Sequence, residues 1–322
     1  MIPAFTLLLA CAVDSLVGDP RHLPHPVVGM GWWITRVERI LRRGMESLRE
    51  GWPIRLLGCL LPLTVVGTVY TVSYFLLTGV ESFSWWAARL LEVWMISTTI
   101  AVKGLADAGR GIFHALEEGD LPGARRALSM VVGRDTDQLE EPEVVRGAVE
   151  TVAENIVDAV TSPLFYAALG GAPLALAYRA VNTLDSMVGY KDEQYRDLGW
   201  ASARLDDLAN WVPARLTILP MLAALALKGH SARRAWRILQ RDARKHPSPN
   251  SGITESLMAG GLGIQLGGEN RYRGILSRRA TLGDSLCPKT PDNIREAVGV
   301  LILCSWLFAW AAAFFCYTVE AL

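Results

Sequence analysis

The stretch LLGCLLPLTVVGTVYTVSYFLLT, from Leu56 to Thr78, decides the fold class. It has 23 residues without a charge, between Arg55 and Glu81. A helix that spans a bilayer needs about 20 apolar residues. A second uncharged run of 23 residues extends from Ala297 to Val319. These runs predict membrane-spanning helices and argue against an ordinary soluble enzyme.

The composition supports a membrane protein. Hydrophobic residues make up 51% of the 322-residue chain, and the mean hydropathy is +0.25. Charged residues make up 20%, below the roughly 25% of soluble domains. The 32 basic and 32 acidic side chains cancel, which argues against a nucleic-acid partner. The five cysteines form no CxxC or even framework, so neither zinc nor disulfides are indicated.

Two further apolar segments carry interruptions. Phe83–Val102 contains Arg89 and Glu92, which can neutralise each other at helical i,i+3 spacing. A short link (79–82) joins this segment to the preceding run, so a hairpin is expected. Ala159–Tyr178 is broken by Gly-Gly-Ala-Pro at 170–173, which predicts two half-length helices or one kinked helix.

Three shorter apolar segments complete the fold prediction. Met1–Gly18 has no Lys or Arg before its apolar run, so a retained helix is favoured over a cleaved signal. Leu216–Leu227 and Ser256–Gly268 are too short to cross a bilayer. We therefore predict an all-α polytopic integral membrane protein with broken or re-entrant helices, forming one membrane-embedded domain over residues 1–322.

Four polar segments lie between the apolar ones and are read as cytoplasmic-side loops. Residues 228–296 carry thirteen Lys and Arg, which favours the cytoplasm by the positive-inside rule. Within them, Ser231–Lys245 reads as a basic helix lying on an anionic leaflet, with Trp236, Ile238 and Leu239 toward the lipid. The other three polar segments are about 19–55, 103–158 and 179–215.

A charged stripe runs through Val144–Val160. Arg146, Glu150, Glu154 and Asp158 recur every four residues on an otherwise apolar helix. One interpretation is a solvated face. However, like charges four residues apart repel, and Asp158 at the lipid boundary would need a cation. The stripe therefore favours a site for a divalent metal or a substrate cation.

A second group of polar residues follows the broken apolar segment. Its first part could be a helix cap and turn, and its second part could be ordinary helix salt bridges. The alternative is a magnesium-bound phosphate site, which needs hard oxygen ligands and guanidinium groups. The first part contains Asn182, Asp185, Ser186, Tyr190 and Lys191, and the second contains Arg204, Asp206, Asp207, Asn210 and Arg215.

Two proline-containing loops complete the polar groups. Residues 245–252 predict a rigid loop that opens a helix, either a plain capped turn or an anion site; its candidates are His246, Ser248, Asn250, Gly252 and, beyond it, Glu255. Near the N-terminus, Asp14 precedes a loop that could bring Arg21 and His25 to a phosphate or carboxylate. Downstream, Leu266–Gly268 and Tyr272 predict a tight turn.

Together, these groups resemble the CobD/CbiB family of cobalamin biosynthesis, the integral-membrane adenosylcobinamide-phosphate synthases. The resemblance covers about residues 10–285 in family order, with Ala159 and Ile253-Thr254 as local departures. The matching strings are DSLVGDP (14–20) with His25-Pro26, ETVAEN (150–155) with Asp158, NTLDSMVGYK (182–191), ARLDD (203–207) with Asn210, Pro213 and Arg215, and His246 with SPNSG (248–252), Glu255 and LGG (266–268).

The resemblance implies an ATP-dependent carbon–nitrogen ligase with its active site facing the cytoplasm. It would join aminopropanol phosphate, or a related amino alcohol, to a propionate carboxylate of adenosylcobyric acid. Mg²⁺ would bind Glu154, Asp206 and Asp207, and ATP would be the co-substrate. Implied partners are the lipid bilayer and later membrane-bound enzymes of the pathway.

Each candidate residue has an implied role. The catalytic set is Glu150, Glu154, Asp158, Asp185, Asp206 and Asp207. The substrate- or phosphate-binding set is Asp14, Arg21, His25, Asn155, Asn182, Ser186, Tyr190, Lys191, Arg204, Asn210, Arg215, His246, Ser248, Asn250, Gly252 and Glu255.

Two alternative functions remain open. A membrane prenyltransferase also uses paired Asp side chains to hold Mg²⁺ and diphosphate. A transport or signalling protein could be built on the same fold, because fold alone does not secure catalysis. A non-catalytic relative would have no reason to keep Glu150, Glu154, Asp206, Asp207 and the 246–252 loop.

Overall fold

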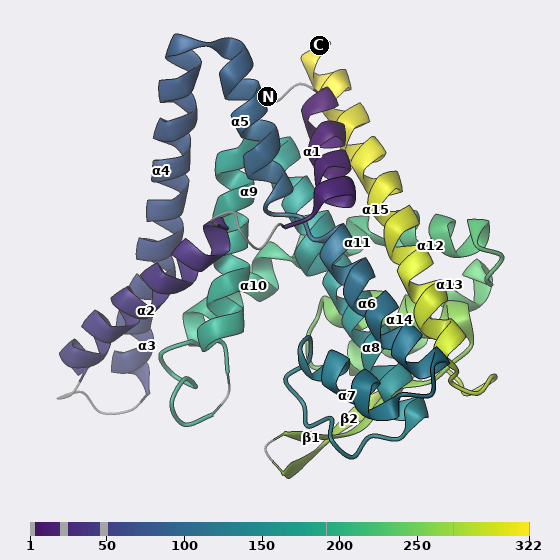
Figure 1. The fold of residues 1–322 in the computed structure, drawn as a ribbon. Helices are drawn as coiled ribbons and strands as arrows, with labels where there is room; N and C mark the ends of the chain where they lie inside the picture. Colours follow the sequence, from purple (N-terminus) through teal and green to yellow (C-terminus); the bar gives the residue numbers. More distant parts are fainter. Residues whose placement is uncertain (1–3, 20–24, 46–50, 191, 273, 322) are drawn as a thin grey trace. The chain divides into compact units, whose positions relative to one another are not determined.

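The computed structural model describes residues 4–19, 25–45, 51–190, 192–272 and 274–321. Nearly all of its regular structure is helical, and one two-stranded hairpin accompanies the helices (Figure 1). The prediction of a helical polytopic fold is confirmed. The chain divides into two compact units, each assembled from separate stretches of sequence. Its description as one domain stays a prediction.

Unit 1 takes its described residues from 1–101, 162–210 and 309–322. It contains α1 (Ala4–Val17), α2 (Pro26–Met45), α3 (Trp52–Gly58), α4 (Leu60–Phe83), α5 (Trp85–Ser97), α9 (Ser162–Val188), α10 (Trp200–Ala209) and the C-terminal end of α15 (Pro291–Glu320).

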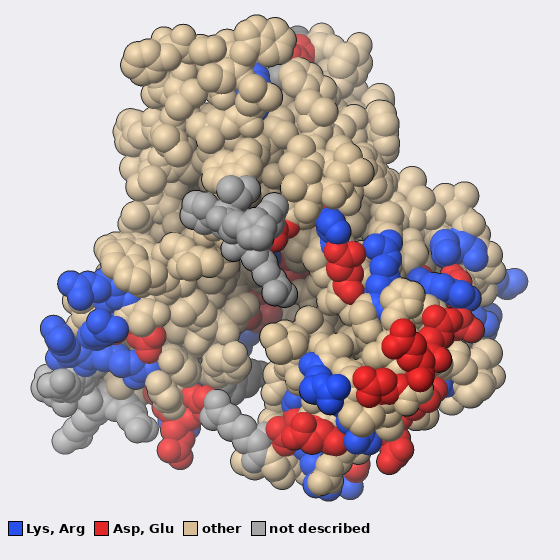
Figure 2. Space-filling model, viewed as in Figure 1, with Lys and Arg blue, Asp and Glu red and all other residues tan. Residues whose placement is uncertain are grey.

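Helices α4 and α5 form the expected hairpin (Figure 1), and the surface over them is largely free of charge (Figure 2). The turn lies at Ser84, just beyond the predicted link, whose residues extend α4 instead. Ser84 Oγ accepts a hydrogen bond from the Ala87 N–H at 3.3 Å and so caps α5. Arg89 and Glu92 form the expected ion pair at 2.5 Å.

Helix α9 is broken where the sequence predicts it. Gly170 and Gly171 leave the helical conformation, with φ values of −148° and 66°, and Pro173 follows them. The positive φ of Gly171 is one that glycine adopts at little cost. At its other end, α9 continues from a π-helical turn, η1 (Val157–Thr161).

Three described helices are long and apolar enough to cross a membrane: Trp52–Phe83, Glu141–Val188 and Pro291–Glu320. A bent pair, Trp200–Leu216 with Ile218–Leu227, makes a fourth if its halves count as one broken span. The chain bends by 46° at the break between these two helices, and each of them is shorter than a spanning helix. The polar segments predicted as loops are largely helical, and contain α2, α6, α7, α10 and α13.

Unit 2 takes its residues from 102–161 and 211–308. It contains α6 (Val102–Glu117), α7 (Leu121–Ser129), α8 (Glu141–Ile156), η1, α11 (Trp211–Leu216), α12 (Ile218–Leu227), α13 (Ala232–Asp242), η2 (Ala243–Lys245), α14 (Ser251–Leu262), β1 (Leu266–Tyr272), β2 (Ile275–Leu282) and the start of α15.

Helix α14 is the core of unit 2, since all of its residues are buried. Helix α13 packs against it so closely that a Cβ on Gly260 would lie 2.7 Å from Ala235 Cα. Ile238 and Leu239 of α13 are buried in this contact. The expectation that these two side chains face a lipid leaflet is therefore wrong.

Strands β1 and β2 pair antiparallel, with a register shift between Leu266 and Gly268. The sequence predicts only a tight turn here, and no strands. Gly267 and Gly268 do have positive φ values of 78° and 91°, but they begin a strand. Because the hairpin depends on contacts with distant side chains, its local sequence does not reveal it.

Asp242 ties the end of α13 to the segment after β2. Its carboxylate accepts hydrogen bonds from the Arg241 and Lys245 side chains and from the Gly283 N–H, at 2.6–2.9 Å. Burial alone would raise the pKa of Asp242, but these hydrogen bonds outweigh burial and lower the pKa well below its usual range. The ionised carboxylate is therefore the form that the fold stabilises.

We expect Asp242→Asn to lower the free energy of unfolding by about 1.5–3 kcal/mol, because charge-assisted hydrogen bonds are lost. Asp284, half-exposed and also paired with Arg241, is the control, and Asp284→Asn should cost under about 1 kcal/mol. Because the native pKa is lowered, this contribution is present above about pH 4 and lost as the pH falls further. Thermal unfolding in detergent from pH 3 to 7 measures both effects. Equal losses in the two variants would contradict this role.

Candidate functional site

The structure contains two buried polar clusters, one in each unit. We call the first the α9–α10 cluster; it consists of Asn182 and Asp185 on α9, Asp206 on α10, and Asn210 at the end of α10. We call the second the α8–α14 cluster; it consists of Glu150, Glu154, His246, Ser251 and Glu255. All residues of the first cluster belong to unit 1, and all residues of the second belong to unit 2.

A chain of hydrogen bonds fixes Asn210 in the α9–α10 cluster. Its side-chain Oδ1 accepts hydrogen bonds from Ser162 Oγ at 2.6 Å and from Tyr178 OH at 2.7 Å. Its Nδ2 donates to Asp206 Oδ2 at 3.0 Å. Because a carboxylate oxygen accepts, the NH₂ group of Asn210 faces Asp206, and its amide oxygen faces the two hydroxyl groups.

Asp206 offers an oxygen that the protein leaves available. Only 9% of the residue is exposed, and its Oδ1 has no hydrogen-bond partner among the described residues. Asp185 and Asn182 are its polar neighbours on α9. A buried carboxylate oxygen without a partner is costly, and such a group calls for a ligand or another explanation.

The neighbouring Asp207 has a different environment. Its side chain is 33% exposed and lies 3.5 Å from Arg204 Nη1, while Arg204 is itself 67% exposed. This is the geometry of an ordinary surface pair on a helix. The two adjacent acids therefore lie in different settings, Asp206 buried and Asp207 partly exposed.

Glu150 is held by two buried arginines in the α8–α14 cluster. Its carboxylate accepts hydrogen bonds from Arg134 at 2.5 Å, from Arg146 at 3.1 Å and from the Gly267 N–H at 2.8 Å. Arg146 also donates to the carbonyls of Gly267 and Glu269, which fixes β1 against α8. With its acceptor positions occupied in this way, Glu150 is placed to organise the site.

Glu154 lies one turn further along α8 and is less constrained. It is partly exposed, and it accepts a hydrogen bond from Ser251 Oγ at 3.2 Å. Ser251 is the first residue of α14, so this bond joins the charged face of α8 to the N-terminus of the buried helix. The partial exposure leaves Glu154 able to contact a bound molecule.

Glu255 and His246 face each other deeper in the cluster. Glu255 Oε1 lies 3.4 Å from His246 Nε2, and both side chains are almost fully buried. His246 Nδ1 lies 3.1 Å from the Ser248 nitrogen and 3.2 Å from the Ser248 carbonyl oxygen, so the ring tautomer decides whether it accepts or donates there. Burial lowers the pKa of His246. Burial, with nearby Glu154 and Glu150, raises the pKa of Glu255.

Both pKa directions share one physical cause, because burial disfavours the charged form of each group. The nearby carboxylates of Glu154 and Glu150 add to this effect at Glu255, since like charges repel. A cation bound in the cluster would reduce this repulsion.

The loop before α14 is rigidly built. Ser248 Oγ accepts hydrogen bonds from the N–H groups of Asn250 and Ser251, at 3.3 and 3.2 Å. A Cβ on Gly252 would lie 2.3 Å from the Ala243 carbonyl oxygen, so only glycine fits. Arg215 reaches this loop by donating to Asn250 Oδ1 at 3.1 Å.

The remaining sequence-predicted residues lie in varied settings. Asp14 is buried in α1, and His25 lies 3.1 Å from Asp19. Asn155 and Ser186 donate to carbonyls of their own helices, Tyr190 is 57% exposed, and Asp158 lies in η1. Arg21 and Lys191 lie outside the described residues. The catalytic assignments stay predictions.

Sequence reasoning missed several residues that the structure places in the clusters. Arg134, Asn270, Ser162 and Tyr178 were not candidates, although each makes one of the central hydrogen bonds. Arg146 had a detectable signal, since it precedes Glu150 by one turn in an apolar helix. The others lie 16 or more residues from their partners, and no local pattern connects them.

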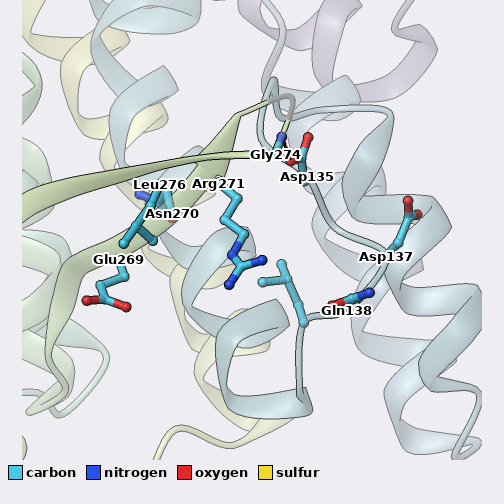
Figure 3. Close-up of a pocket in the computed structure, with 9 residues that line it drawn as sticks. Asp135, Asp137, Gln138, Glu269, Asn270, Arg271, Gly274 and Leu276 are labelled. Carbon is cyan, nitrogen blue, oxygen red and sulfur yellow. Dashed lines mark hydrogen bonds between the residues drawn. The ribbon is translucent and has the colours of Figure 1, made fainter.

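A separate cavity of about 430 Å³ lies between the hairpin and the segment after α7 (Figure 3). The side chain of Arg271 extends from β1 toward the segment that carries Gln138. Arg271 has no ion-pair partner among the described residues, while Asp135 and Asp137 also line the cavity. The cavity thus offers both signs of charge to a small polar molecule.

Within the described part of the chain, no group of three or more His, Cys, Asp or Glu side chains is arranged to hold a metal. Magnesium often binds through only one or two carboxylates, with substrate phosphates and water completing its shell. Asp206 and Asp185 supply carboxylate oxygens of that kind, and the amide oxygen of Asn182 beside them also accepts a hydrogen bond from Arg179 Nη1 at 3.3 Å.

Comparison with known proteins identifies the family. The model of the CobD/Cbib protein family matches residues 7–301. This chain belongs to the CobD/CbiB family. It is 52% identical over 307 residues to the cobalamin biosynthesis protein CobD of Geobacter metallireducens, covering 95% of each chain.

Other CobD/CbiB proteins are similar over nearly their whole length. CobD of Halalkalibacterium halodurans is 46% identical over 92% of this chain and 91% of its own. CbiB of Salmonella paratyphi B is 45% identical over 93% of each. Both carry the name cobalamin biosynthesis protein. No solved structure matches this chain.

The contrast between neighbouring acids of α8 gives a stability test. We expect Glu150→Gln to cost about 3–5 kcal/mol of unfolding free energy, because it removes the charge that pairs with buried Arg134 and Arg146. Glu154→Gln, which loses one hydrogen bond at a partly exposed site, should cost under about 1.5 kcal/mol. Thermal unfolding of the two variants in detergent measures both losses of stability. A stable Glu150→Gln protein would remove Glu150 from its organising role.

Proposed function

We propose that this CobD/CbiB protein is an ATP-dependent amide ligase of cobalamin biosynthesis. It would attach aminopropanol phosphate, or a related amino alcohol, to a propionate carboxylate of adenosylcobyric acid. Full-length similarity to cobalamin biosynthesis proteins carries the proposal. The buried polar clusters support it, because an apolar membrane chain has little structural reason to hold so many acids.

The proposed chemistry balances as follows. A carboxylate does not react with an amine unaided, so an oxygen of the propionate attacks the γ-phosphorus of ATP and ADP leaves. The amine nitrogen then attacks the carbonyl carbon of the acyl phosphate, inorganic phosphate leaves with the bonding electron pair, and the nitrogen loses a proton. Phosphoryl transfer of this kind depends on positioning and charge stabilisation.

We assign the α9–α10 cluster to Mg²⁺ and the nucleotide phosphates. Asp206 and Asp185, with Asn182, would hold the metal, and the unpartnered Oδ1 of Asp206 supports this fit. The bound ion would offset negative charge on the transferring phosphoryl group. Asn210 keeps Asp206 oriented through its hydrogen bond.

We assign substrate contact in the second cluster to Glu154, because it is partly exposed and only lightly bound. Glu150 and its two arginines would position α8, and the His246–Glu255 pair would respond to charge in the cluster. Arg215, over the ring of Trp211 at 4.3 Å, would supply a guanidinium for phosphate oxygens.

The alternative functions predict different reaction products. A transport or signalling protein would not form an amide, and a prenyltransferase would not consume ATP. Similarity to named cobalamin biosynthesis proteins favours the ligase. We also propose a cell-membrane location with the active site facing the cytoplasm, where ATP is present, and association with later membrane-bound enzymes of the pathway.

The direct test incubates purified protein in detergent with adenosylcobyric acid, ATP, Mg²⁺ and candidate amines. We expect mass spectrometry to detect the amide together with one ADP per product, and neither without ATP. Absence of amide with every amino alcohol and amino alcohol phosphate tested would overturn the ligase proposal.

Two adjacent acids provide the matched control for that assay. Asp206→Asn should raise the Mg²⁺ concentration for half-maximal activity at least tenfold, because a buried charged ligand is lost. Asp207→Asn removes an exposed surface partner and should leave this midpoint nearly unchanged. A larger increase of the midpoint in Asp207→Asn than in Asp206→Asn would place the metal at Asp207, which the sequence also predicts as a ligand.

Orientation can be measured with natural and added cysteines. Cys287 is exposed and lies in the basic segment 228–296, while Cys59 is the other exposed cysteine described. In a Cys59→Ser background we expect an impermeant maleimide to label Cys287 only after cells are permeabilised. A Glu118→Cys probe in segment 103–158, placed in a Cys59→Ser/Cys287→Ser background, should behave alike. Labelling of either site in intact cells would reverse the proposed orientation.

A further inference from the structure

A second, smaller pocket lies at the polar end of α15 in unit 2. Its volume is about 220 Å³, and its lining includes Arg110 and Phe113 of α6, Lys228 after α12, and Arg295 of α15. No lining residue is acidic. Three cations from separate elements around one hollow are unusual, because like charges repel unless an anion lies between them.

Close packing gives this pocket a firm floor. A Cβ on Gly109 of α6 would lie 2.6 Å from Val298 Cγ2, so α6 and α15 touch where no side chain intervenes. A Cβ on Gly299 would lie 2.8 Å from Lys228 Nζ, so the lysine side chain lies across this glycine. A larger residue at position 299 would therefore displace the Lys228 side chain from its place in the pocket lining.

The three cations have acidic neighbours outside the pocket, and these pairs are weak. Arg110 lies 3.2 Å from Asp107, Arg295 lies 2.8 Å from Asp292, and Lys228 lies 3.4 Å from Glu296, which His230 also contacts. All six paired side chains are at least 28% exposed. Exposed pairs contribute about 0–1 kcal/mol, so the cations can turn to a stronger anion at low cost.

The pocket lies where two apolar helices meet polar sequence, and this indicates its depth in a membrane. The uncharged run of α15 begins at Ala297, directly after Arg295 and Glu296, and continues to Val319. Lys228 directly follows the apolar helix α12. Basic side chains at the ends of apolar helices lie at the level of lipid headgroups. Along α15, Ile302 and Trp306 continue the apolar surface from the pocket.

We propose that this pocket binds the phosphate group of an anionic phospholipid. The guanidinium groups of Arg110 and Arg295 and the ammonium of Lys228 match a phosphate, and Phe113, Val298 and Ile302 match the carbon chains attached to it. The volume lies below that of ordinary small-molecule sites, which suits a headgroup. A free phosphate would use the cations and leave the apolar wall unmatched.

The test measures thermal unfolding of the full-length protein in a neutral detergent. Lipid that binds the native state raises the melting temperature in proportion to its affinity. We expect phosphatidylglycerol to stabilise the wild type, and phosphatidylcholine or inorganic phosphate at the same concentration to have little effect. The triple variant Arg110→Gln/Lys228→Gln/Arg295→Gln should weaken the apparent affinity for phosphatidylglycerol at least tenfold.

Two further variants distinguish binding in the pocket from a general attraction between anionic lipid and exposed cations. Arg126→Gln/Arg244→Gln/Arg278→Gln removes three exposed cations elsewhere in unit 2 and should keep the wild-type response. Gly299→Leu keeps every charge, fills the pocket and should lose the response, which also covers a failure of the triple variant to fold. An unchanged response in Gly299→Leu would overturn the pocket. Equal stabilisation by inorganic phosphate would overturn a lipid in favour of a soluble anion.

Discussion

A buried charge must have a partner, and unit 2 is organised around one that has several. Arg146 is 2% exposed, and its guanidinium bonds Glu143 and Glu150 on its own helix as well as backbone and side-chain oxygens of β1. Removing any partner from such a set leaves a charge uncompensated in a medium where that is expensive. The position of the hairpin and the orientation of Glu150 depend on this side chain together with Arg134, which also bonds Glu150 and Asn270.

The sequence predicts those parts of the fold that depend on local chemistry. Uncharged runs identify the long helices, Gly170-Gly171 identifies the break in α9, and Arg89 with Glu92 identifies a self-neutralising pair. The hairpin escapes prediction because its first strand is held by Arg146, more than 100 residues away. The difference between Asp206 and Asp207 also escapes it, since adjacent residues on a helix point about 100° apart and only packing shows which is buried.

The two polar clusters differ in chemistry. Asn210 connects Asp206 to the hydroxyl groups of Ser162 and Tyr178, and Arg179 donates to Asn182 Oδ1 at 3.3 Å. That cluster therefore joins carboxylates to hydroxyl, amide and guanidinium groups. The cluster of α8 and α14 combines carboxylates, two arginines and a histidine, so its net charge depends on what binds.

The separation in sequence between Arg146 and its partners also sets the order in which they are synthesised. Gly267, whose carbonyl accepts from Arg146, leaves the ribosome 121 residues later. At roughly 5–20 residues per second, that interval lasts roughly 6–24 s. During it, the charged face of α8 has to stay in contact with water or with temporary partners. The hairpin of α4 and α5 is already complete in sequence by then, so it can form before Arg146 meets its partners in β1, whereas the apolar helix α15 follows later.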